Sequence, residues 1–303
     1  MTHDLSHSRV RHTLLNVLIA SAAMALIGHA YAQGSDSADS QSILGDQFNV
    51  NFGLGMAVLP RYMGADEYRS QVLPMFGLGM AVLPRYMGAD EYRSQVLPML
   101  TVQRGIFFAD TTRGLGLQWQ SASGLGASAA LNYDFGRTEK NSTNRPGSNE
   151  LRGMGTVEGA TVGDFTVSQQ LTPWLSASAE AELRVAGEKR GNRYRLGFEG
   201  IAYHSQSDTV TLDIDAHAGD GRYNQTYFGV SPIQSQRSGF SRFTADSGIY
   251  AYSAALAWQH TFDAHWSTVA SVGVTHYTDQ TRGSPLVETD AEGSGLLALN
   301  YAF

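Results

Sequence analysis

Histidine and serine side chains are the first candidates for chemistry in this sequence. A serine activated by a neighbouring histidine is a nucleophile for acyl transfer. Five of the nine histidines lie near serines, in or beside segments of alternating polarity: His204, His217, His260, His265 and His276. No recognisable lipase or protease motif surrounds any of them, and with many serines such pairs arise by chance. We therefore predict no catalytic residue, and a hydrolase is the most remote alternative.

Asp213, Asp215 and His217 form a second candidate group. In an extended strand, residues two apart share a face, so these three side chains could converge on one metal ion. An internal salt-bridge network is an equally good explanation, because nearby segments carry charges of both signs: Glu180, Glu182, Arg193 and Arg195. We favour the network and predict no metal ligand and no cofactor.

Composition removes several classes of protein. The 303 residues include no cysteine, which excludes disulfides, thiolate metal sites and thiol catalysis. The net charge of -7 argues against a nucleic-acid partner, which normally leaves a basic stripe. The 33 glycines and 10% aromatic residues, beside only 16% charged residues, are typical of strands joined by tight turns.

The N-terminus indicates export. Arg9 and Arg11 precede the apolar run 13–28, and small residues around Ala32 offer a cleavage site, as in a secretory signal peptide. The alternative, an uncleaved membrane anchor, is disfavoured because the run is shorter than the roughly 20 residues that a helical span needs. We predict a signal peptide over 1–32 and a flexible, small and polar leader over 33–45.

From residue 46 onward the dominant period is two. Aromatic and apolar residues from Tyr250 to Phe262 occupy one face of a strand and small or polar residues the other. The strands are longer than in most soluble sheets, and the polar faces carry Asp, Glu and Arg, as in a barrel with lipid outside and a polar lumen. An aromatic girdle is expected from residues near strand ends: Trp174, Tyr250, Phe262, Trp266 and Tyr301. His260 and His265 are then interfacial and His217 lumenal.

The sequence therefore predicts an all-β, antiparallel, up-and-down transmembrane barrel over 46–303, in the outer membrane and in contact with its lipid. Its last strand alternates and ends on an aromatic residue, a signal that we expect the barrel assembly machinery to read: Leu297, Leu299, Tyr301 and Phe303. Long loops are expected at 137–157, 220–247 and 280–290. Strands are expected near 46–60, 70–83, 94–103, 105–112, 114–122, 124–136, 158–170, 173–186, 192–206, 208–219, 248–262, 265–279 and 291–303.

That count of strands is odd, whereas single-chain bacterial barrels have an even number. The surplus is explained by a repeat: residues 52–75 read FGLGMAVLPRYMGADEYRSQVLPM, and residues 76–99 repeat them without substitution. Two identical copies indicate a recent in-frame duplication. We predict a barrel of about twelve strands whose opening hairpin comes from the second copy. Most of 46–69 is then a periplasmic or lumenal extension, poorly packed or unpaired.

Two loops carry specific motifs. Each copy of the repeat contains P-R-Y-M-G-A-D-E-Y-R, over 60–69 and 84–93. Its glycine suits a positive φ, its tyrosines suit the lipid interface, and we expect its Asp and Arg to pair across the loop base. The second loop contains Y-F-G-V followed by S-G-F. The motif residues are Tyr86, Gly88, Asp90, Tyr92 and Arg93 in the first loop, and Tyr227, Phe228, Gly229, Ser238 and Gly239 in the second.

These motifs make the sequence resemble the MipA/OmpV family of Gram-negative outer-membrane proteins. Members show P-x-Y-x-G-S-D-x-Y-R, where this chain has Ala for Ser, and Y-F-G-V-T followed by S-G-L, where it has Ser231 and Phe240. The resemblance implies a non-enzymatic scaffold joining a murein hydrolase, a lytic transglycosylase, to a murein synthase. Other members are linked to envelope stress, osmotic or antibiotic response and adhesion. The alternative from the residues themselves is a narrow channel for small solutes.

Overall fold

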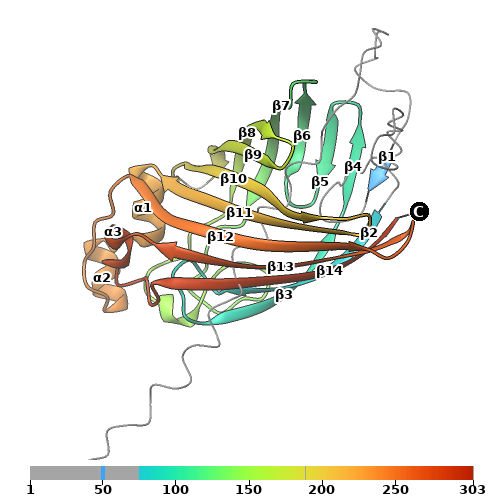
Figure 1. The fold of residues 1–303 in the computed structure, drawn as a ribbon. Helices are drawn as coiled ribbons and strands as arrows, with labels where there is room; N and C mark the ends of the chain where they lie inside the picture. Colours follow the sequence, from blue (N-terminus) through green and yellow to red (C-terminus); the bar gives the residue numbers. More distant parts are fainter. Residues whose placement is uncertain (1–48, 52–74, 188, 303) are drawn as a thin grey trace, which may run out of the picture.

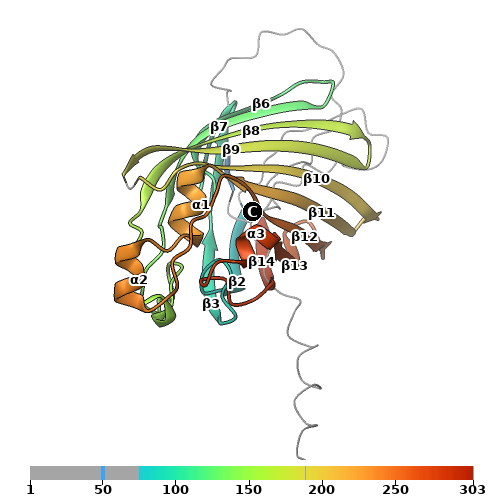
Figure 2. The ribbon, with the colours of Figure 1, turned by 90° about the vertical axis from the view of Figure 1, so that its left-hand side faces the viewer.

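A computed structural model describes residues 49–51, 75–187 and 189–302, in which antiparallel strands wrap into a nearly closed barrel (Figures 1 and 2). The strands are β1 (Asn49–Asn51), β2 (Met75–Pro84), β3 (Tyr92–Met99), β4 (Thr101–Arg104), β5 (Phe107–Asp110), β6 (Gly114–Gln120), β7 (Leu125–Asp134), β8 (Ala160–Thr172), β9 (Leu175–Gly187), β10 (Arg193–His204), β11 (Asp208–Gly219), β12 (Gly248–Thr261), β13 (Trp266–Tyr277) and β14 (Ala291–Ala302). Within these residues no helix is long and apolar enough to cross a membrane.

The barrel wall closes through one strand that is divided at Leu100. Its first part, β3, pairs with β2, and its second part, β4, pairs with β5. The last strand, β14, pairs with β2 from Gly295 opposite Val82 to Ala302 opposite Met75. Taking β3 and β4 as one strand, the described residues form a wall of twelve strands, from β2 round to β14. The predicted fold class and even strand number are confirmed.

The register shows how the wall accommodates the repeat. The second copy forms the hairpin β2–β3, as predicted. The strand β1, just before the first copy, pairs with β4: Asn51 lies opposite Thr101 and Val50 opposite Val102. On the same side of this divided strand, Gly77 lies opposite Met99. Without the 24 residues 52–75, Asn51 would precede Phe76, and the two ladders would form one uninterrupted register. β1 and β2 are therefore two parts of one wall strand.

The expectation that most of 46–69 is left over stays a prediction, because the structure describes only residues 49–51 of that range, and these pair with β4. In the register of β2 and β3, the residues before Phe76 would pair with β4, and β1 makes that pairing. The predicted signal peptide over 1–32, the predicted leader over 33–45 and residues 52–74 lie outside the described residues.

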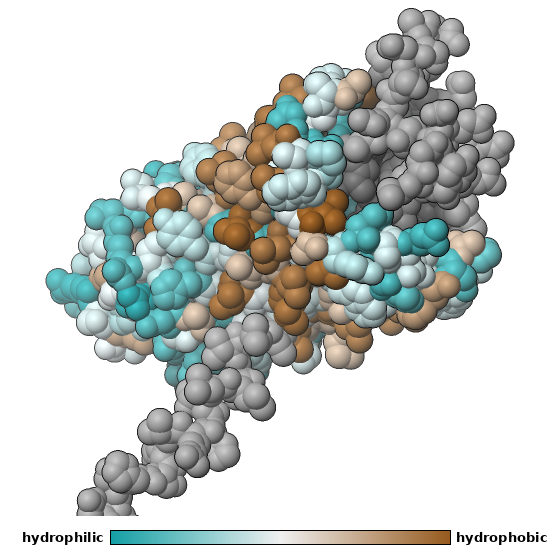
Figure 3. Space-filling view, viewed as in Figure 1, coloured by the Kyte–Doolittle hydropathy of each residue, from teal (hydrophilic) through white to brown (hydrophobic). Residues whose placement is uncertain are grey.

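The two faces of the wall differ as the alternation requires. Large apolar side chains point outward along the strands and form a hydrophobic belt, which Figure 3 shows as a brown zone across the middle of the barrel. Of the expected girdle, Trp174 is 58% exposed, Phe262 58% and Trp266 41%. The prediction that Tyr250 belongs to the girdle is wrong, because Tyr250 is only 5% exposed. The register between β11 and β12 shifts after His217, which turns Tyr250 inward and leaves Ile249 outside.

The long loops gather at the end of the barrel opposite the C-terminus (Figure 1). This end also carries helices that the sequence analysis missed: the short η1 (Asn149–Leu151), α1 (Gly221–Phe228), α2 (Pro232–Ser238) and α3 (Asp279–Arg282). Local signals for two of them were present. Asp220 caps α1 by accepting a hydrogen bond from the Tyr223 N–H, and Ser231 forms a capping box with Gln234. The strand ends at the other rim are joined by short turns.

Candidate functional site: the loop cap and the lumen beneath it

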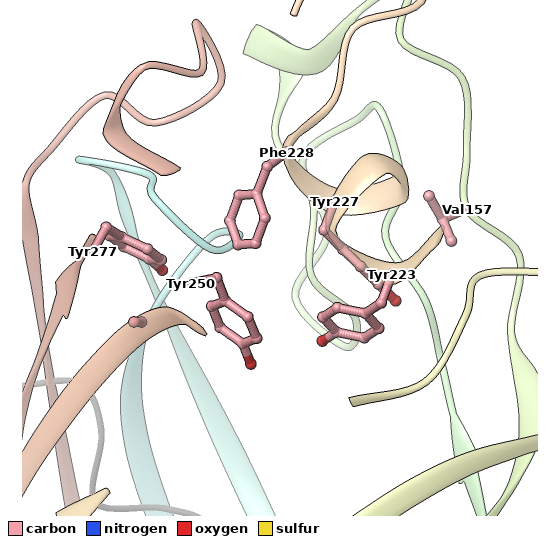
Figure 4. Packing of buried hydrophobic residues seen from close by; sticks show 7 residues of the cluster. Val157, Tyr223, Tyr227, Phe228, Tyr250 and Tyr277 are labelled. Atoms are coloured by element: carbon pink, nitrogen blue, oxygen red, sulfur yellow. The ribbon is translucent and has the colours of Figure 1, made fainter. Parts of the chain in front are cut away.

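Four loops pack together over one end of the barrel, and we call residues 85–91, 135–159, 220–247 and 278–290 the cap. Two buried clusters hold the cap together. The first contains Val157, Tyr223, Tyr227, Phe228, Tyr250, Ala251 and Tyr277 (Figure 4). The second contains Tyr86, Ala89, Leu151, Met154, Val230 and Leu286. Because both clusters draw on several loops, the cap is a packed unit rather than a set of independent loops.

The helix α1 supplies the centre of the cap. Its aromatic residues Tyr223 and Tyr227, one helical turn apart, face the same side, and their ring centroids lie 4.6 Å apart. Phe228 follows and packs against Tyr250, with ring centroids 5.4 Å apart (Figure 4). Burial raises the pKa of the Tyr223 and Tyr227 hydroxyls, so both remain neutral hydrogen-bonding groups at physiological pH.

The first motif loop is built around Gly88. Its φ is 90°, and a Cβ there would lie 3.0 Å from Val287 Cα. The Gly88 N–H donates to Glu292 Oε2 at 2.8 Å, and its carbonyl accepts from the Glu288 N–H at 2.7 Å. Positive φ and close approach both require glycine, which explains this motif position physically.

The other residues of that loop depart from expectation in two ways. Tyr86 is buried in the second cluster instead of lying at the lipid interface, because the loop folds over the lumen. Asp90 and Arg93 do not pair: the Asp90 N–H lies 3.4 Å from Glu288 Oε2, and Arg93 Nη1 donates to the Thr143 carbonyl at 2.8 Å. Tyr92 accepts a hydrogen bond from the Gly293 N–H at 3.0 Å. The first motif thus links its loop to two others.

The second motif loop is held by its backbone. The Tyr227 carbonyl accepts from Arg137 Nη1 at 2.8 Å, and the Phe228 carbonyl accepts from the Ser284 hydroxyl. Three further motif residues end helices: Gly229 caps α1, Ser238 Oγ donates to the Gln234 carbonyl at 2.8 Å, and Gly239 ends α2 with φ 84°. The structure therefore brings the two sequence motifs into one cap, where each has a structural role.

Directly beneath the cap, Arg190 connects it to the lumen. Its side chain is 1% exposed and bonds to Asp134, at 3.1 Å, and to Glu182. It also lies 3.3 Å from the Tyr227 hydroxyl. Burial opposes its charge, but the interactions with Glu182, Tyr227 and Asp134 together outweigh that effect and raise the pKa of Arg190. Sequence reasoning missed Arg190 and Asp134, because Arg190 lies outside the alternating segments and Asp134 is 56 residues away from it.

The lumenal face of β9, β10 and β11 carries the predicted salt-bridge network. Glu182 also bonds Arg193. One level further from the cap, Arg195 bonds Glu180 at 2.8 Å and Asp215 at 3.0 Å. With Asp215 engaged in this way, it does not join Asp213 and His217 around one point. In the described residues no group of three His, Asp or Glu side chains is arranged to hold a metal ion.

A serine does lie beside His217. The His217 Nε2 atom is 2.8 Å from Ser253 Oγ, and Asp215 Oδ2 lies 3.5 Å from the same hydroxyl. In a hydrolytic triad the carboxylate orients the histidine, whereas here both groups meet the serine. The arrangement therefore serves as a structural hydrogen-bond chain across β11 and β12.

The C-terminal strand faces lipid as predicted. Leu297 is 61% exposed and Leu299 48%. Tyr301 stacks on His265 and meets Trp266 edge-on, with ring centroids 5.7 and 4.8 Å apart. These contacts place His265 and Tyr301 in the aromatic girdle at the rim opposite the cap, which we call the turn end. Phe303 lies outside the described residues, and recognition by the assembly machinery stays a prediction.

Comparisons with known proteins agree with this architecture. The model of the family described as MltA-interacting protein MipA matches residues 76–303. No curated protein matches. Solved structures that resemble the chain include the NanC porin, with 9% identity, 75% of this chain and 98% of that chain covered and a TM-score of 0.39.

Two further solved structures are similarly remote. The monoaromatic hydrocarbon channel CymD has 10% identity, with 76% and 88% covered and a TM-score of 0.38. OprB of Pseudomonas putida has 12% identity, with 69% of this chain covered and a TM-score of 0.36. The match spans 59% of the OprB chain. Similarities this remote say nothing about the function of this barrel. The family match, however, begins at the second residue of β2 and covers the wall from there through β14, so the chain is an outer-membrane barrel protein that belongs to the MltA-interacting protein MipA family.

Proposed function

We propose that the protein is a closed barrel that acts as a scaffold for a murein-remodelling enzyme and has no catalytic activity of its own. The observation that carries the proposal is the cap, whose aromatic clusters pack together at one end of the barrel, above Arg190, which is bonded to the wall. A solute pore needs an open path through the lumen. The packed cap and the buried, ion-paired Arg190 oppose such a path. A barrel without such a path still offers a rigid membrane anchor for a partner protein.

The orientation of the barrel indicates where that partner binds. The start of β2 and the end of β14 lie at the same rim, because Met75 is opposite Ala302. In barrels of this class both termini are periplasmic, and long loops face outward. A murein enzyme works in the periplasm, so we propose that it binds at the turn end and not at the cap.

Conductance in planar bilayers tests the closed state. We expect the full chain to give no large, stable current steps. A matched variant in which residues 221–246 are replaced by a short Gly-Ser linker lacks α1 and α2 and should conduct, which shows that the assay detects an opened lumen. Large, stable and ion-selective steps from the unmodified chain would refute the closed barrel.

Affinity capture tests the scaffold. The tagged protein, extracted from envelopes in mild detergent, should recover a murein hydrolase or synthase identified by mass spectrometry. The linker variant should recover the same enzymes, because the proposed contact lies at the opposite rim. Recovery of neither enzyme class by the unmodified chain would contradict the scaffold.

A narrow channel is the second candidate, and one observation favours it. Several buried lumenal atoms have no hydrogen-bond partner among the described residues: Thr211 Oγ1, Ser271 Oγ and Asn300 Oδ1. Buried polar groups of this kind are normally satisfied by water, which supports a hydrated lumen below the cap. This alternative predicts small current steps from the unmodified chain in planar bilayers. The steps should disappear in Ser271→Trp, because the larger side chain narrows the lumen.

A further inference from the structure

Two lumenal carboxylates face each other without an intervening cation. Glu199 on β10 and Asp213 on β11 are direct partners in the strand register, and their carboxyl groups lie within hydrogen-bonding reach of each other. Ionised carboxylates only accept hydrogen bonds, so the pair needs a proton or a cation between its oxygens. Asp213 is 4% exposed, and its Oδ2 has no hydrogen-bond partner in the part of the chain that the structure describes.

The nearby guanidinium groups are committed elsewhere. Arg195 uses its two terminal nitrogens on Glu180 and Asp215, and Arg193 bonds Glu182. The three arginines of the network pair with Asp134, Glu180, Glu182 and Asp215, which leaves Glu199 and Asp213 without an ion-pair partner among the described residues. Uncompensated buried carboxylates are costly, so the charge imbalance also favours a cation.

The nearest further donor, one level further from the cap, is also an oxygen. Thr211 lies two residues before Asp213 and so shares its face of β11. Its Oγ1 is buried and, like Asp213 Oδ2, lacks a partner within the described ranges. Oxygen-only surroundings suit hard cations, and Mg²⁺ in particular is usually held by one or two carboxylates while it keeps several waters. Such a site needs no third acidic or histidine ligand.

We propose that a hydrated Mg²⁺ ion binds in the lumen between Glu199 and Asp213, with the Thr211 hydroxyl and water as its other ligands. The ion bridges β10 and β11 about midway between the cap and the turn end, and it neutralises the carboxylates that the arginine network leaves over. The inference is independent of whether the barrel binds a murein enzyme.

The test uses the full mature barrel, refolded in detergent and freed of metal with EDTA, and titrates it calorimetrically with MgCl₂. We expect saturable binding of one ion, with a dissociation constant on the order of 10⁻⁴–10⁻³ M, as for other weak oxygen-ligand sites. Glu199→Gln and Asp213→Asn should each weaken binding at least about tenfold, since even changes outside the ligand shell have effects of that size.

Asp164→Asn is the matched control, because Asp164 is also a lumenal carboxylate, on β8, but is bonded to Asn132 at 3.2 Å. It should bind Mg²⁺ as the unmodified chain does. Resistance of each variant to unfolding in SDS without heating verifies that it is folded.

Three outcomes would overturn the proposal. The first is no saturable Mg²⁺ binding by the unmodified barrel. The second is binding that survives in both Glu199→Gln and Asp213→Asn. The third is a thermal stability that rises in those variants and does not respond to Mg²⁺ in the unmodified chain, which would mean that the pair shares a proton.

Discussion

Arg190 is the residue on which the connection between cap and wall most depends. It is buried and bonds to two acidic residues and a tyrosine from three different segments. Removing one member of a buried ion pair leaves the other charge uncompensated, which costs about 3–5 kcal/mol.

We therefore expect Arg190→Ala to destabilise the folded barrel by about that amount, measured as a lower urea midpoint by tryptophan fluorescence in micelles. Arg282→Ala is the control, because Arg282 pairs with Asp279 and Asp290 on the exposed surface, and exposed pairs contribute little. Equal midpoints for the two variants would show that Arg190 is not the link described.

Gly88 allows a second test at this scale. An L-residue at positive φ costs roughly 1–2 kcal/mol, and at Gly88 a Cβ would also meet the Val287 backbone. Gly155 has a similar φ of 81° but no atom within 4 Å of its added Cβ. Gly88→Ala should therefore lower the urea midpoint more than Gly155→Ala does. If the two substitutions are equivalent, the contact with Val287 does not constrain the loop.

At the scale of elements, the repeat is accommodated by division of one strand. β1 and β2 share a single register against β4 and β3, so the residues between them are not needed for the ladder. A chain lacking residues 52–75 would place Asn51 directly before Phe76 and restore a continuous strand.

Deleting residues 52–75 should therefore leave assembly intact. The deleted chain should reach the outer membrane, resist unfolding in SDS without heating and unfold at a urea midpoint at least as high as that of the full chain. Deleting residues 76–99 instead would give an identical chain, because the two copies have the same sequence. Loss of assembly would show that the surplus unit has become structural.

Among the elements, the strands followed from the sequence, and the helices did not. A strand in a barrel wall has one face toward lipid, so the strands from β6 to β14 show an alternation with a period of two that the sequence alone reveals. The cap helices are short, and their burial depends on other loops. Even so, the capping residues Asp220 and Ser231 were visible. Tyr250 was misplaced because a register shift against β11 reverses the alternation there.

At the scale of the whole molecule, the two ends of the barrel differ in structure. The cap packs aromatic clusters over one rim above the buried Arg190, while the turn end carries the girdle residues Trp266 and Tyr301. The proposed scaffold uses this difference, because the proposal assigns the partner to the turn end, where β2 begins and β14 ends. The lumen between the two ends holds the salt-bridge network and the Glu199–Asp213 pair.

The sequence by itself determined the barrel, its lipid-facing belt, the surplus unit and the two motif loops, because alternation, repetition and motif spacing are local properties of the chain. The structure decided that the motifs form one cap, that Arg190 bonds Asp134, and that Glu199 faces Asp213 while Asp215 is taken by Arg195. Those pairings join residues far apart in the chain. They depend on the stagger of neighbouring strands, which only closure of the wall fixes.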